Sequence, residues 1–142
     1  MEPGFQFGVL WSDDDVIELR VSAWNGTFGG SADLYVGIGH LEETAARLDG
    51  FPSSPSDTRE LIFGSFDPKL VGGGVSMHFY CADGAAHGRV ESNIESRRDS
   101  AGSAQSVHLL LPIEAASVDT FVGELRQLGV SREGIARLRV SR

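Results

Sequence analysis

The feature that most constrains this chain is a polar loop, Asp83–Gly88, between two stretches in which apolar and polar residues alternate. Every second residue from Val75 to Cys81 is apolar, and Val90 and Ile94 stand among charged and polar residues after the loop. A period of two is typical of a β-strand with one buried face. The sequence therefore predicts an antiparallel hairpin inside a larger sheet.

The register of this hairpin follows from its apolar residues. If one side of the hairpin is buried, the apolar side chains of both strands must point the same way. Pairing Cys81 with Val90 and Met77 with Ile94 achieves this. One face is then expected to be core, and the opposite face to meet water or a partner.

Other stretches show a similar alternation. Strands are expected at residues 5–11, 16–23, 27–36, 59–66, 107–113 and 135–140. The third is interrupted at Gly29-Gly30, which we interpret as a bulge or bend. Asn25-Gly26 before it favours a turn, because both residues accept a positive φ. Gly72–Gly74 is expected to be a flexible joint, and Arg98–Gln105 a loop.

Two stretches have the helical period instead. Apolar residues recur on one face of His40–Leu48, which predicts a short amphipathic helix. A stronger stripe, which includes Phe121 and Leu125, runs through Glu114–Leu128. Gly129 follows where a glycine commonly ends a helix.

These elements favour an α+β domain. We expect residues 1–142 to form a single globular domain with one mainly antiparallel sheet of about six to eight strands and two amphipathic helices on one face. A pure β-sandwich is the alternative, and the second helix argues against it.

Composition narrows the classes of function. The chain has 20 acids, 12 Lys and Arg and a net charge of −8, which argues against nucleic acid as a ligand because phosphate binding needs clustered cations. The sequence contains no run of 18 apolar residues, so no membrane span is expected. The N-terminus lacks the pattern of a signal peptide, and Cys81 is the only cysteine. We therefore expect a cytoplasmic protein without a disulfide or a thiolate zinc site.

Four polar residues are candidates for chemistry. His78 and His108 fall on the polar faces of their strands, and the two imidazoles approach if those strands are neighbours. Asp83 and His87 share the hairpin loop, but a metal or acid–base site needs at least a third group. We interpret the polar residues of the loop as those that a tight turn needs, and the strand histidines as solvated. We expect neither a metal nor a cofactor.

Two further motifs give little support to a catalytic or cofactor-binding function. Cys81 alternates with core residues and is expected to be a small buried hydrophobe, because a nucleophilic thiol needs an electropositive, accessible setting. Gly37-Ile38-Gly39 lies between a strand and a helix, as in a dinucleotide fingerprint. Glu42 stands where that motif needs its third glycine, and its carboxylate would repel a pyrophosphate.

The order of these elements resembles a known family over roughly residues 25–128. The matching segments are Phe28-Gly29-Gly30, Leu41–Leu48 with Phe51-Pro52-Ser53, Phe63–Pro68, Gly73–Asp83, His87-Gly88, and Leu111–Ala116 with Asp119 and Phe121. In these segments the chain is similar to the WapI-type immunity proteins of bacterial polymorphic toxin systems. The resemblance implies a non-enzymatic protein that binds and neutralises a cognate toxin domain, and it brings no catalytic residues with it.

Acidic residues are the candidates for such binding. Residues 1–67 contain twelve acids and three bases, a local net charge of −9, which suits a basic partner. Six acids lie in turns or on predicted polar faces: Asp13, Asp14, Asp15, Asp33, Glu42 and Glu43. The competing interpretation for each is an ordinary solvated acid. The alternative function is an enzyme or small-ligand-binding domain that uses His78, Asp83, His87 and His108.

Overall fold

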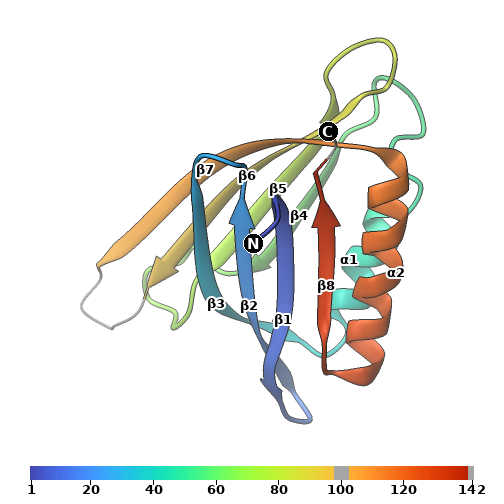
Figure 1. The fold of residues 1–142 in the computed structure, drawn as a ribbon. Coiled ribbons are helices and arrows are strands. Elements are labelled where there is room, and N and C mark those ends of the chain that lie inside the picture. Colours follow the sequence, from blue (N-terminus) through green and yellow to red (C-terminus); the bar gives the residue numbers. More distant parts are fainter. Residues whose placement is uncertain (98–102, 141–142) are drawn as a thin grey trace.

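The computed structural model describes residues 1–97 and 103–140, and within them the chain forms eight strands and two helices (Figure 1). Their order is β1 (Gly4–Ser12), β2 (Val16–Trp24), β3 (Gly29–Gly37), α1 (His40–Leu48), β4 (Arg59–Gly64), β5 (Gly74–Cys81), β6 (Gly88–Arg97), β7 (Ala104–Ile113), α2 (Ala115–Ser131) and β8 (Ile135–Arg139). The predicted loop Arg98–Gln105 falls mostly outside the described residues, and Ala104 and Gln105 already belong to β7.

The strands form two antiparallel sheets of four. Sheet A has the order β3-β2-β1-β8, and sheet B has the order β4-β5-β6-β7. The α+β class is confirmed, but the single sheet of about six to eight strands is wrong. Alternation shows which face of a strand is buried and not which sheet it joins. Here β4 pairs with β5 and not with β3, so β4 to β7 make a second sheet, and β8 returns to pair with β1.

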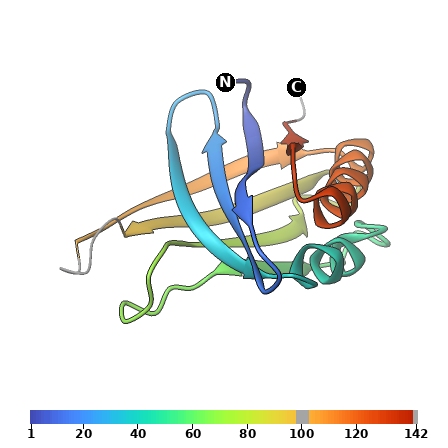
Figure 2. The ribbon, with the colours of Figure 1, turned by 90° about the horizontal axis from the view of Figure 1, so that it is seen from below.

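The strands of sheet A run across those of sheet B (Figure 2). The inward residues of β3 approach sheet B closely, because β-carbons built on three glycines would meet the facing layer. The added β-carbon would lie 2.7 Å from Val107 Cγ1 at Gly30, 2.9 Å from Ala32 Cβ at Gly73, and 2.9 Å from Leu34 Cβ at Gly64. The close crossing is therefore made by small residues.

The helices lie at the other end of sheet B, beside β8 (Figure 2). Phe121 of α2 packs on Phe7 of β1 with ring centroids 5.4 Å apart, and Phe7 meets Phe63 of β4 at 4.8 Å. Phe51, after α1, packs on Phe79 of β5 at 5.7 Å. All five rings are buried, so large aromatic side chains fill the helix-covered end of the core.

Arg59 ties α1 to sheet B. Its Nη1 donates to the backbone oxygens of Arg47 and Asp49 at 2.8 and 3.0 Å, which closes the end of the helix. Its Nε and Nη2 donate to the Asp57 carboxylate at 2.9 and 2.8 Å, and the guanidinium lies over the Phe51 ring. These contacts lower the pKa of Asp57 well below its ordinary value, chiefly through the hydrogen bonds from Arg59.

The predicted hairpin forms with a different register. Cys81 pairs with Gly88 and Met77 with Ser92, two residues away from the expected partners. A shift by two keeps every side chain on its face, so Val90 and Ile94 are buried as expected.

Helix α2 runs beyond its predicted end. It continues to Ser131, and Arg132 rather than Gly129 takes the left-handed conformation at its C-terminus. Gly129 instead faces α1, where a β-carbon would lie 3.5 Å from Leu41 Cβ. Neither described helix is long and apolar enough to cross a membrane.

Candidate functional site

Five of the six predicted binding acids gather at one end of the molecule. Gly37, which leads into α1, pairs with Val16 at the end of the β1–β2 turn, and Arg132 Nη1 donates to the Asp13 backbone oxygen at 3.0 Å. Since the end of α2 also packs on the start of α1, the turn and the first turn of α1 lie on the same side. We call Asp13, Asp14, Asp15, Glu42 and Glu43 the acidic end.

The carboxylates of the acidic end differ in what holds them. Asp13 Oδ1 accepts from the backbone N–H groups of Asp15 and Val16 at 2.8 and 2.9 Å, and these bonds lower the pKa of Asp13. Asp13 therefore builds the turn. The other four side chains are exposed and enter no ion pair within residues 1–97 and 103–140. Their charge is left to the solvent or a partner.

Asp33 lies elsewhere, on the outer face of sheet A. Its carboxylate accepts from Arg20 Nε at 2.8 Å and Nη2 at 3.0 Å across the β2–β3 pair. This bidentate pair neutralises Asp33. The structure thus separates Asp33 from the five acids with which it was grouped, because strand β3 carries it away from the turn and the helix.

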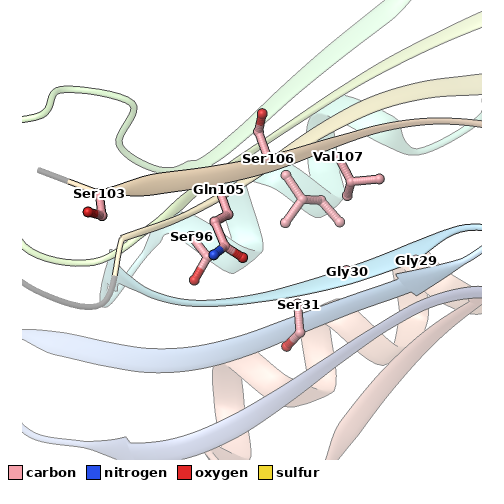
Figure 3. Close-up of a pocket in the computed structure, with 9 residues that line it drawn as sticks. Gly29, Gly30, Ser31, Ser96, Ser103, Gln105, Ser106 and Val107 are labelled. Atoms are coloured by element: carbon pink, nitrogen blue, oxygen red, sulfur yellow. The ribbon is translucent and has the colours of Figure 1, made fainter.

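A groove follows the free edge of β3, and we call it the edge groove (Figure 3). Its first half is a cleft of about 550 Å³, with walls formed by β3 and by the ends of β6 and β7. The lining includes Gly29, Gly30, Ser31, Ser96, Gln105 and Ser106. None of these side chains carries a charge.

The second half of the edge groove continues toward the β4–β5 loop. This depression of about 620 Å³ shares Ser31 and Ser96 with the first and extends past Asp33 and Tyr35 to Gly72. The N–H of Gly73 donates to the Asp33 backbone oxygen at 2.8 Å, so the loop closes the edge of β3 at this point. No such bond between described residues closes the groove beside Gly29 and Ser31.

The histidines do not form one site. Strand β6 separates β5 from β7, so the condition for an approach of His78 and His108, that their strands are neighbours, is not met. His78 Nδ1 lies 3.3 Å from Glu60 Oε1, and His108 Nε2 lies 3.0 Å from Glu91 Oε1.

Asp83 and His87 are brought together by the hairpin loop. His87 Nδ1 lies 2.8 Å from Asp83 Oδ2, and the backbone N–H of Ala85 donates to Asp83 Oδ1 at 2.9 Å. Both contacts lower the pKa of Asp83, that with His87 most. No group of three His, Cys, Asp or Glu side chains in the described part of the chain is placed to hold a metal ion.

Cys81 is partly buried between sheet B and the loop after α1. Its Sγ lies 3.7 Å from the backbone oxygen of Ser54. Burial raises the pKa of the thiol, and the charges of Asp57 and Asp83 raise it further. The setting keeps the sulfur protonated and disfavours a nucleophilic role.

Sequence reasoning missed the edge groove and an exposed aromatic pair. Strict alternation places Trp11 on the buried face with Phe7, but an irregularity between Val9 and Trp11 turns the indole outward. There its ring centroid lies 6.4 Å from that of Tyr35. Residues 9–11 contain no glycine that would indicate such an irregularity. The groove left a faint signal, since Gly29-Gly30 in a strand can mark a close approach of another backbone.

Comparison of the chain with protein-family models, curated proteins and solved structures finds no match in any of the three.

Proposed function

We propose that the protein is a non-enzymatic binding protein, an immunity protein that neutralises a basic toxin domain through its acidic end. The observation that carries the proposal is the gathering of Asp14, Asp15, Glu42 and Glu43, four exposed carboxylates without an ion pair among the described residues. The resemblance to WapI-type immunity proteins supplies the class of partner.

Clustered unpaired carboxylates favour a basic partner for a physical reason. Their negative potentials add, which speeds the encounter with a positive surface and aligns it before contact. Exposed charges contribute little to folding stability, so this end can carry them at small cost to the fold. Asp33 is not part of the proposed interface, because Arg20 already pairs with it.

The proposal is tested by co-expression with the C-terminal domain of the product of the neighbouring gene. The protein should restore growth and form a stable complex with that domain. Association should be fast at low salt and slow steeply as ionic strength rises. Failure to rescue growth or to bind would contradict the immunity function.

Charge reversal tests the interface separately. Glu42→Lys with Glu43→Lys should slow association and weaken binding while leaving the melting temperature nearly unchanged. The matched control is Glu2→Lys with Asp119→Lys, which changes the net charge equally away from the acidic end. If rescue persists and both pairs of substitutions have the same effect, the interface lies elsewhere although the function stands.

A further inference from the structure

The outer edge of β3 presents main-chain groups that no strand covers. In an antiparallel strand, alternate residues direct their N–H and C=O groups toward opposite edges. The Asp33 oxygen accepts from Gly73, on the side away from β2, which places the groups of Gly29 and Ser31 on that side as well. No hydrogen bond between described residues closes the outward groups of these two residues.

Residues of sheet B form a floor beneath the space beside this edge. Gly30 of β3 lies above Val107, which pairs with Ile94 in sheet B. The next row on the same face is the pair Ser96 and Gln105, which extends past β3 and lines the edge groove. Two residues along a strand span about 6.7 Å, and neighbouring strands lie about 4.8 Å apart, so one more strand beside β3 would lie over this row.

We propose that the edge groove binds an extended peptide segment of a partner protein, which adds to sheet A as a strand beside Gly29 and Ser31. The segment would exchange main-chain hydrogen bonds with the two open N–H and two open C=O groups. This mode of recognition takes its affinity from the backbone and its selectivity from alternate side chains.

The floor also identifies the segment's chemistry. Side chains that point down from the added strand would meet Ser96 and Gln105, which offer hydrogen bonds but no charge. A buried charge without a partner is costly, so small polar residues are favoured at these positions. Because Gly73 closes the edge at Asp33, the segment must extend past Gly29 toward Phe28, whose side chain is 63% exposed.

A second copy of the chain does not fit. Antiparallel pairing of two β3 edges about a twofold axis places both copies of sheet B in the same layer. In each copy the row of Ser96 and Gln105 projects beyond β3 into the space that the other copy's floor needs. The row of Ser96 and Gln105 therefore supports a strand from a different protein but excludes β3 of a second copy.

This inference does not depend on the proposed function. The edge groove and the acidic end are formed by different residues, and each can be altered while the other is left intact. A protein that fails to neutralise a toxin can still bind a peptide here.

The test uses a phage-displayed library of random ten-residue peptides selected on the immobilised full chain. Enriched peptides are synthesised, and their binding is followed by fluorescence anisotropy and by amide chemical shifts. The decisive variant is Ser31→Pro, which removes the outward N–H and places the ring in the groove. Proline is tolerated on an edge strand where its missing N–H faced solvent, so the fold should persist. The matched control is Ser31→Thr, which keeps the N–H.

Peptides should bind the wild type and Ser31→Thr alike, should be weakened about tenfold or more by Ser31→Pro, and should shift the amides of Gly29 and Ser31 most. Gln105→Trp, which fills the floor, should weaken binding as well and serves if Ser31→Pro unfolds. The proposal is overturned if no peptide is enriched, if both variants bind as the wild type does, or if the shifts lie elsewhere. Self-association abolished by Ser31→Pro would also overturn it, in favour of a dimer interface.

Discussion

The two ends of sheet B are covered by opposite means. At one end β3 crosses the sheet and approaches through Gly30 and Ala32, with Gly73 below. At the other end the layers stand apart, and the buried rings of Phe51 and Phe121 belong to the space between them. We call these the crossing end and the helix end. The same core can therefore be destabilised by a loss of volume at the helix end and by a gain of volume at the crossing end.

Loss of volume at the helix end should have the largest effect. Phe121→Ala removes a ring with no exposed surface and leaves a cavity beside Phe7. We expect the free energy of unfolding to fall by about 3–5 kcal/mol, measured by urea denaturation. A loss below about 1 kcal/mol would mean that α2 does not bury this face.

The helix end also depends on one charged contact. Asp57→Asn removes the carboxylate that holds Arg59, and we expect a loss of about 1.5–3 kcal/mol at neutral pH. The pKa of Asp57 is lower in the folded state than in the unfolded state, so its contribution is complete above the unfolded value and is lost as pH falls through the folded one. The difference between wild type and variant should therefore stay constant from pH 7 to about pH 5 and shrink as the pH falls below about 4. A difference independent of pH would contradict the ionic origin.

Gain of volume should damage the crossing end. A β-carbon on Gly73 would lie 2.3 Å from the Glu95 backbone oxygen and 2.9 Å from Ala32 Cβ. Gly73→Ala should destabilise the protein by about 1–3 kcal/mol, because the backbone must shift. The control is Gly123→Ala in α2, where the β-carbon would meet no atom within 4 Å. That change should stabilise the helix by about 0.5–1 kcal/mol, and equal effects of the two substitutions would remove the contrast.

The smallest expected effect sharpens the same contrast. A β-carbon on Gly30 would meet Val107 Cγ1 at 2.7 Å, a side-chain methyl group and not backbone. Gly30→Ala should therefore cost about 1 kcal/mol, less than Gly73→Ala. Val107→Ala should relieve part of this cost in the double variant. Strict additivity of the two changes in thermal unfolding would indicate that these residues do not touch.

Much of this architecture could be predicted from the sequence, and the features that were not predicted depend on contacts between distant residues. The helix His40–Leu48 was predicted with its observed bounds, and burial of Phe121 and Leu125 followed from one helical face. Such patterns are local. The pairing of β8 with β1 is not, so the split into two sheets left no periodic signal.

Glycine was the other source of error. Gly72–Gly74 resembles a flexible joint in the sequence, yet Gly73 and Gly74 are buried, and a side chain on either would strike backbone. The candidate site shows the same limit. The acids were found by charge, but only the fold reveals that Asp33 belongs with Arg20 and that Glu42 lies near the Asp13 turn.

The pairing of β8 with β1 has a consequence for how the chain folds during synthesis. Strands β1 to β3 form a local meander that can assemble once residues 4–37 have emerged, whereas β8 follows at residues 135–139. Until then the second edge of β1 stays unpaired while sheet B is made, and an open edge invites pairing with other chains. Contacts between such distant residues also slow the final step. The nascent protein should therefore depend most on chaperones in the interval between the completion of the first meander and the arrival of β8.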